Sequence, residues 1–296
     1  MTKQPLKGRN RERAGLMFVA PFIVVFLTFF VTPLFYSAYL SVFKQTLVGG
    51  NHFVGLANYA KALVDPQFRT GLWHVALFFV LQVPVMLVLA TGLALAIDSG
   101  KLRGAKFYRI VAFLPYAVPA VVSAVIWGYL YGPNYGLAAQ LSRYMPFPKI
   151  DFLSAGLALP SLANIVTWEF TGYNMIIMYA ALKSISTDLY EAAAVDGAGA
   201  IRIAWSIKLP ALRPAIFLTF LFSVIGTFQL FTEPYNLANV APMVFNNSYT
   251  PNIYAYSTSF TSLNQNYAAA LSFLLGFVVI IMSGALTLVA RNRRES

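Results

Sequence analysis

The chain has 296 residues, of which 58% are hydrophobic and only 10% are charged, and its mean hydropathy is +0.66. Soluble domains carry roughly 25% charged residues, so this composition excludes an ordinary water-soluble domain and favours a protein that lies in lipid. The net charge of +11 does not indicate nucleic-acid binding, because the basic residues stand in short runs between apolar stretches.

Six apolar runs are long enough to cross a bilayer as helices, for which about 20 residues are needed. The basic segment 1–13 precedes the first run. Because residues 14–43 contain no charge, we interpret this run as a retained membrane span and not as a cleaved signal peptide. The predicted spans are 15–40, 72–97, 108–130, 159–182, 214–231 and 268–290, and a short tail, 291–296, follows them. The sequence therefore predicts an all-α polytopic membrane protein with six transmembrane helices over residues 14–290.

The distribution of basic residues predicts the orientation in the membrane. The two tails and the loops after the second and fourth spans together hold 16 of the 21 Lys and Arg residues. Cytoplasmic segments of membrane proteins carry an excess of Lys and Arg. We therefore expect these segments, including both termini, on the cytoplasmic side of the cell membrane.

One ionisable residue, Glu169, lies well inside a predicted span, where a charge is costly and marks a functional candidate. Tyr173 follows one turn later on the same helical face, and Asn174 is its neighbour. A ring and a carboxylate on one face suit a sugar, because the ring stacks on C–H groups while the carboxylate accepts hydroxyl protons. Two alternatives stay open. In the first, Glu169 lies near the outer end of the span and simply reaches water, or bonds to a neighbouring helix. In the second, it belongs to a proton relay, although no second buried acid or histidine is evident.

Polar residues also stand at the outer end of the fifth predicted span. Gln229 and Glu233 share a helical face, and Pro234 is expected to end that helix. They form either an ordinary polar helix end or part of a substrate path. Trp127 is interpreted as an interfacial anchor and is a further candidate for the path. Glycines within the spans are expected to be close-packing points; they are Gly92, Gly128, Gly172, Gly226, Gly276 and Gly284.

Motifs of common enzymes are absent from the sequence. The chain has no phosphate-binding G-x-x-x-x-G-K-[S/T] loop, no G-x-S-x-G and no H-E-x-x-H. With no cysteine and only His52 and His74, neither disulfides nor a metal site is expected. We therefore expect no catalytic residue, no metal and no cofactor in this chain.

The loop 184–213 is the main predicted cytoplasmic feature. TDLYEAAAVDG predicts a short helix capped by Thr187 or Asp188. Gly197 and Gly199 break it, and a second short helix is expected at about 200–208. Leu209-Pro210 is expected to stop that helix, and Pro214 to start the fifth span. The apolar face Ile201–Ala204–Trp205 predicts a surface that another protein holds.

The pattern E-A-A-x3-G-x9-I-x-L-P in this loop resembles the EAA loop of the membrane subunits of ATP-binding cassette (ABC) importers. It is met at Glu191, Ala192, Ala193, Gly197, Ile207, Leu209 and Pro210. FVGLANYAKAL (53–63) and FLPYAVPAVVSAVIWGYLYGP (113–133) resemble the first outer loop and third span of binding-protein-dependent oligosaccharide permeases of the maltose type. TGYNM, GTFQLFTEPYN and SYTPNIYAYSTSF resemble permeases for cellobiose, xylobiose or chitobiose-type sugars.

The resemblance implies the type I ABC importer permease fold and the partners of such a machine. These are a second permease subunit, generally a different chain, two cytoplasmic ATPases that bind ATP and Mg, and an extracellular lipoprotein that delivers an oligosaccharide. The EAA loop is then the coupling helix seated in an ATPase groove, with Glu191 paired to a basic group and Gly197 permitting the turn. Asp196 either takes part in coupling or only caps the second helix.

The function that the resemblance implies is transport by alternating access and not an enzymatic reaction. Three alternatives remain open. The first is an ABC permease for another solute, such as glycerol phosphate or an amino acid. The second is a proton-coupled secondary transporter that uses Glu169, and the third is a membrane-embedded enzyme.

Overall fold

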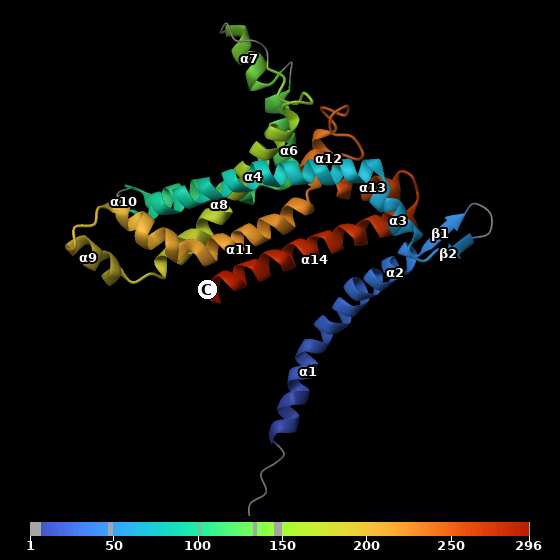
Figure 1. Cartoon of the computed structure of the whole chain (residues 1–296), viewed down its shortest axis with the longest axis horizontal. Coiled ribbons are helices and arrows are strands. Elements are labelled where there is room, and N and C mark those ends of the chain that lie inside the picture. Colours follow the sequence, from blue (N-terminus) through green and yellow to red (C-terminus); the bar gives the residue numbers. More distant parts are fainter. Residues whose placement is uncertain (1–6, 47–49, 101, 133–134, 145–149, 296) are drawn as a thin grey trace, which may run out of the picture. The chain divides into compact units, whose positions relative to one another are not determined.

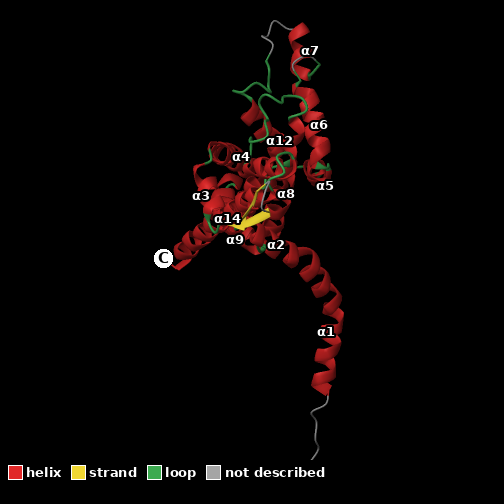
Figure 2. Ribbon diagram, turned by 90° about the vertical axis from the view of Figure 1, so that its right-hand side faces the viewer, coloured by secondary structure: helices red, strands yellow, loops and turns green. Residues whose placement is uncertain are grey.

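The computed structural model describes residues 7–46, 50–100, 102–132, 135–144 and 150–295. Residues 1–6 and 296 of the predicted cytoplasmic tails therefore lie outside the described residues, as do Lys101 and Lys149, which entered the charge count. The chain divides into two compact units, Met1–Val64 with Thr258–Leu274, and Asp65–Ser257 with Leu275–Ser296. The described residues are helical apart from one two-stranded hairpin and the connecting loops (Figure 2).

The first unit begins with a helix that continues through a π-helical turn. α1 (Lys7–Phe26), η1 (Leu27–Val31) and α2 (Thr32–Ser41) follow without a break, and the hairpin of β1 (Phe43–Thr46) and β2 (Gly50–Phe53) and then α3 (Ala57–Val64) come next. Asn58 ties α3 to the end of α2, because its buried amide donates to Ser41 O (2.8 Å) and Phe43 O (2.9 Å). The apolar stretch of α1–α2 is not buried within the chain, as expected of a helix that faces lipid or another subunit.

The core of the second unit is formed by three helices that lie side by side, α4 (Pro66–Asp98), α8 (Ala158–Lys183) and α11 (Leu209–Phe228) (Figure 1). Asp65 caps α4 by accepting a hydrogen bond from Gln67 N at 2.9 Å, and Pro66 occupies the first turn, where no N–H donor is needed. Two apolar clusters hold the helices together; their fully buried members include Phe78, Leu162, Ile165, Val83, Ala90, Met178 and Leu212.

The third predicted span, 108–130, is not one straight helix. It is divided into α5 (Ala105–Phe113), a 3₁₀ turn η2 (Leu114–Ala117) and α6 (Ala120–Tyr131), with a bend of 95° between the two parts. Pro119 explains the break, because a residue before proline is driven out of the helical region. Val118 is extended, with φ −78° and ψ 128°. The short α7 (Leu137–Tyr144) follows.

The loop after α8 also differs from its prediction. α9 (Thr187–Val195) is capped by Ser186, whose hydroxyl accepts from Asp188 N, and not by Thr187 or Asp188 themselves. α10 (Ala200–Ile203) continues through a π-helical stretch, η3 (Ala204–Lys208), directly into α11. Leu209-Pro210 therefore does not stop a helix. Pro210 directly follows the π-helical stretch, where the hydrogen-bond pattern is already altered, and Pro214, the predicted start, lies inside α11.

The remaining helices are α12 (Thr232–Leu237), α13 (Pro251–Phe260) and α14 (Gln265–Glu295). Among the described residues, four helical segments are long and apolar enough to cross a membrane, at 15–41, 66–98, 200–237 and 265–288, and the bent pair α5–α6 brings the number to five. α8, the fourth predicted span, is not among them. It buries polar side chains such as Thr167, Glu169 and Asn174, and a helix enclosed by protein does not need the apolarity of one that faces lipid.

Candidate functional site

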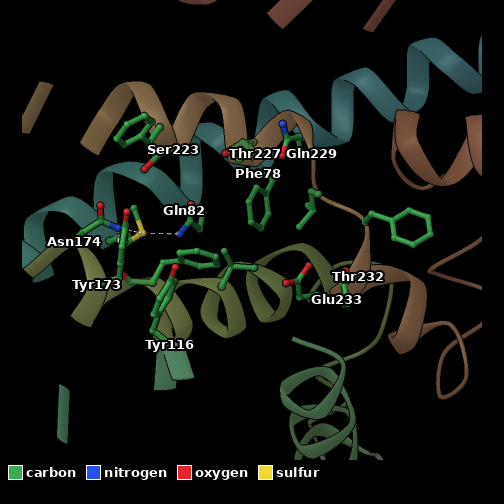
Figure 3. A pocket seen from close by; sticks show the side chains of 17 residues that line it. Phe78, Gln82, Tyr116, Tyr173, Asn174, Ser223, Thr227, Gln229, Thr232 and Glu233 are labelled. Carbon is green, nitrogen blue, oxygen red and sulfur yellow. Dashed lines mark hydrogen bonds between the residues drawn. The ribbon is translucent and has the colours of Figure 1, made fainter. Parts of the chain in front are cut away.

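A cavity of about 400 Å³ lies in the second unit between α4, α8, α11 and the turn that leads to α12 (Figure 3). Its lining combines aromatic rings with amides, hydroxyls and one carboxylate, and no Lys, Arg or His is among the described residues that line it. The aromatic members are Phe78, Tyr116, Phe170, Tyr173, Phe222 and Phe231; the polar members are Gln82, Asn174, Ser223, Thr227, Gln229, Thr232 and Glu233; the others are Met86, Val166, Gly226 and Leu230. Rings with a few polar groups are typical of a small-molecule site.

An aromatic wall forms one side of the cavity. Tyr116 of η2 stacks on Tyr173 of α8 with ring centroids 4.6 Å apart and planes 21° apart, and it meets Phe170 edge-on at 5.7 Å. Gly172 allows this approach: a Cβ there would lie 1.8 Å from Ala112 O. The break after α5 and the bare glycine backbone therefore bring Tyr116 to the cavity.

Two buried amides stand beside this wall, with Asn174 next to Tyr173 on α8 (Figure 3). Gln82 Nε2 lies 3.3 Å and Asn174 Nδ2 3.4 Å from the sulfur of Met86, and Asn174 also donates to Phe170 O at 2.9 Å. A thioether is a weak acceptor. Both amides therefore have hydrogen-bonding capacity that hydroxyl groups of a ligand could use.

Two buried acids meet at the α12 end of the cavity. Glu233 lines the cavity and is 8% exposed, while Glu169 is 3% exposed and interacts with it electrostatically. The expectation that Glu169 has no second buried acid near it is therefore wrong; α12 supplies one after a turn that the sequence pattern did not reveal. Neither carboxylate oxygen of Glu169 has a hydrogen-bond partner among the described residues, nor has the nearby Ser123 hydroxyl.

The structure brings together Tyr173, Asn174, Gln229 and Glu233 of the predicted path, whereas Glu169 and Trp127 are not among the lining residues. Trp127 packs against Tyr131 and Trp168. Gln229 ends α11 and Glu233 begins the separate α12, with Pro234 inside α12 and not at the end of one common helix. Sequence reasoning missed Gln82, Tyr116, Ser223, Thr227 and Thr232; an isolated glutamine in an apolar run was the strongest available signal.

The predicted close-packing role of the glycines holds at two positions. A Cβ at Gly172 would enter the backbone of α5, and one at Gly128 would lie 3.3 Å from a Leu237 methyl. A Cβ at Gly92, Gly226, Gly276 or Gly284 would meet nothing within 4 Å. For these four the prediction is wrong within the described chain.

The loop that carries the E-A-A-x3-G pattern is a well-formed helix with a tight end. Gly197 has φ +78°, its N–H donates to Ala194 O, and Ala198 N donates to Ala193 O, which is the hydrogen-bond pattern of a Schellman cap. Asp196 is the C-cap of α9 and not the cap of the second helix, whose N-cap is Gly199. Glu191, Ala192, Asp196 and Gly197 are exposed, whereas Ile207, Leu209 and Pro210 are half-buried.

These features define a membrane transport protein: helices apolar enough to span a bilayer, a ligand-sized cavity between them and an exposed helical loop. Residues 87–295 match the family model described as "Binding-protein-dependent transport system inner membrane component", and the chain belongs to this family.

Named relatives extend over nearly the whole chain. The lactose transport system permease protein LacF of Rhizobium radiobacter is 32% identical, with 95% of each chain covered. The diacetylchitobiose uptake system permease protein NgcF of Streptomyces coelicolor is 30% identical over 96% of this chain and 87% of that protein. The sn-glycerol-3-phosphate permease protein UgpA of Agrobacterium fabrum is also 30% identical, over 90% and 91%.

A solved structure confirms the fold. A chain of a bacterial alginate ABC transporter, solved in complex with an alginate pentasaccharide-bound periplasmic protein, superposes with a TM-score of 0.84 at 18% identity, covering 98% of both chains. The ABC importer permease fold that the EAA-loop resemblance predicted is therefore present.

Proposed function

We propose that the chain is the membrane-spanning permease subunit of an ATP-driven importer and that it translocates an uncharged oligosaccharide by alternating access. The observation that carries this proposal is the lining of the α4–α8–α11 cavity. Stacked rings suit the C–H faces of a sugar, and amides, hydroxyls and a carboxylate suit its hydroxyl groups. The resemblance to lactose and diacetylchitobiose permeases supports the same class of substrate.

The charge of the cavity distinguishes this substrate from the anionic ones that some relatives carry. Glycerol phosphate is the substrate named for UgpA, and alginate, an acidic polysaccharide, is named for the structural neighbour. A phosphate or uronate needs a cation or backbone N–H donors for recognition. Within the described part of the chain, the lining of this cavity offers Glu233 with Glu169 behind it and no basic side chain, so an anion would be repelled.

The loop 184–213 is proposed to couple the chain to an ATPase. Its Glu191, Ala192 and Gly197 face solvent on a rigid, capped helix, as a surface that docks onto a separate subunit requires. In this proposal two partner ATPases bind ATP and Mg, and the bound ATP closes the ATPase dimer. A second permease completes the path, and an extracellular binding lipoprotein supplies the sugar. Closure of the ATPases draws the two coupling helices together. The cavity then closes toward the cytoplasm and opens toward the outside of the cell.

The membrane arrangement is part of the same proposal. Six spans are reached when α8 and the bent pair α5–α6 are counted with the four apolar segments. Both termini and the loop 184–213 then lie in the cytoplasm, where the excess of Lys and Arg places them.

The proposal is tested by uptake into liposomes that contain the chain, its second permease and the ATPases, with the binding protein outside. ATP inside is expected to drive uptake of labelled lactose, cellobiose or diacetylchitobiose, and not of glycerol 3-phosphate or a uronate disaccharide. Uptake of the anions in preference to the neutral sugars would refute the assigned substrate class. Uptake without ATP would refute the importer itself.

The Glu169–Glu233 pair is the specific observation that favours a second candidate, proton-coupled transport, since paired buried acids occur in proton relays. The same liposomes decide between the two. Proton coupling requires that an imposed pH gradient drives uptake without ATP and that a protonophore abolishes it. The proposed importer predicts neither effect.

A further inference from the structure

An ion cluster around a buried carboxylate group lies where the loop 184–213 returns to the helical core. The side chain of Asp98, the last residue of α4, is only 4% exposed and binds two lysines. Lys208 Nζ, at the end of η3, lies 2.5 Å from Asp98 Oδ2, and Lys183 Nζ, at the end of α8, lies 2.8 Å from Oδ1. The loop has a first limb, α9, and a second limb, α10 with η3. The Asp98 carboxylate therefore joins the ends of α4 and α8 to the second limb.

The first limb of the loop reaches the same cluster. The Lys208 ammonium lies 4.9 Å from the centroid of the Tyr190 ring, which is within the range of a cation–π contact. Tyr190 belongs to α9 and precedes Glu191 directly in the chain. Burial raises the pKa of Tyr190, and the Asp98 carboxylate raises it further, so the ring stays a neutral phenol. Lys208, which belongs to the second limb, thus contacts the first limb and the end of α4.

The two lysines differ in their surroundings. The Lys208 side chain is 12% exposed, whereas that of Lys183 is 56% exposed. An exposed ion pair contributes little, but removing one partner of a buried pair leaves a charge without compensation. The contact of Asp98 with Lys208 is therefore the stronger constraint, and it is the one that crosses from the core helices to the loop.

We propose that Asp98 and Lys208 form a clamp that makes α9 move as one body with the end of α4, so that movement of the coupling helix reaches the helix that lines the cavity. Both residues are positioning residues, since neither lies at the cavity. α4 carries the link directly, because its earlier turns contribute Phe78, Gln82 and Met86 to the cavity lining. This inference rests on the proposed coupling role of the loop.

The decisive experiment measures a distance inside the chain and needs no sugar. The sequence has no cysteine, so spin labels can be placed at Thr187→Cys in α9 and Leu89→Cys in α4, both exposed positions. The labelled chain is assembled with its second permease and ATPases. The distance between the two labels is measured by pulsed electron paramagnetic resonance, first without nucleotide and then with ATP plus vanadate. The clamp predicts one narrow distance distribution that is the same in both states.

Lys208→Met is expected to broaden this distribution or shift it with nucleotide, and Asp98→Asn to do the same. Lys208→Arg keeps the charge and is expected to restore the narrow distribution. The matched control is Lys183→Met, which removes the exposed partner of the same carboxylate and should leave the distribution unchanged. A distribution in Lys208→Met identical to that of the unaltered chain would overturn the proposal.

A second readout separates the clamp from simple loss of stability. At equal amounts of assembled complex, Lys208→Met is expected to keep the basal ATPase rate. The stimulation by binding protein with lactose, cellobiose or diacetylchitobiose is expected to fall by about tenfold, a change within the usual range of coupling between two sites. If Glu191→Lys retains full stimulation, the coupling role of the loop is wrong. If Glu191→Lys loses stimulation but Lys208→Met does not, only the clamp is wrong.

Discussion

Tyr116 and Tyr173 stack across two helical elements that are far apart in sequence, with ring centroids 4.6 Å apart. The contact exists because η2 turns the chain after Leu114-Pro115 and because Gly172 lets α5 lie against α8. The pair forms a flat apolar surface beside the amides of Gln82 and Asn174. In the proposed function it is the surface on which a sugar ring stacks.

Replacement of Tyr173 tests this stacking surface. Tyr173→Ala removes the ring and leaves Tyr116 without its stacking contact. A lost aromatic contact of about 1 kcal/mol corresponds to a several-fold weaker interaction. We therefore expect a several-fold higher half-saturation concentration for uptake of neutral disaccharide. Tyr173→Phe keeps the ring and is the control. Unchanged uptake kinetics in Tyr173→Ala would remove the ring from the path.

Replacement of Gly172 tests the close approach of α8 to α5. A methyl group there would collide with Ala112 O, and because this atom is backbone, the helices must move apart. We expect Gly172→Ala to lower the stability by about 1–3 kcal/mol, the usual cost of overpacking. A melting temperature of purified Gly172→Ala in detergent below that of the unaltered chain would show this loss of stability.

The control for this prediction is Gly92→Ala. A Cβ at Gly92 meets nothing within 4 Å, and alanine is the better helix former by about 1 kcal/mol. Gly92→Ala is therefore expected to melt at the same temperature as the unaltered chain or higher. Equal melting temperatures for both variants would contradict the packing seen at Gly172.

Neutralisation of the two acids tests their separate roles. Glu233 lines the cavity and Glu169 does not, so Glu233→Gln is expected to reduce neutral-sugar uptake several-fold, while Glu169→Gln keeps a near-normal rate. The amide of Glu169→Gln can donate to the Glu233 carboxylate, which also relieves repulsion between like charges. Initial rates in the liposome assay distinguish the two. Loss of uptake in Glu169→Gln alone would assign the essential charge to the residue behind the cavity.

Changes in the coupling helix test the proposed contact with an ATPase. Glu191→Lys reverses an exposed charge, and Gly197→Asp puts a side chain at φ +78°, where L-residues are strained by about 1–2 kcal/mol. We expect both variants to reach the membrane in normal amounts but to lose sugar-stimulated ATPase activity and uptake. The control is Asp188→Lys, which reverses an exposed acid of the same helix outside the pattern. Normal stimulation in Glu191→Lys and Gly197→Asp would refute the coupling assignment.

Much of the architecture follows from composition and local pattern. The length of the apolar runs predicts membrane helices, because about 20 residues are needed to cross lipid whatever surrounds them. The E-A-A-x3-G spacing in the loop after α8 led to the family, and the helix ending at Gly197 follows from the glycine itself. These features depend on residues close together in the chain, whose effects act before any tertiary contact forms.

The cavity and the ion cluster were decided only by tertiary structure. Tyr116, Gln82 and Thr227 come from three different helices, and nothing in their own segments shows that they meet. Glu233 reaches Glu169 because the chain turns after Gln229 into a separate helix, α12, and Lys208 reaches Asp98 because α11 packs against α4. Such contacts join residues far apart in sequence, and which of them form depends on how whole helices pack, where one missing methyl group at Gly172 determines how closely two backbones approach.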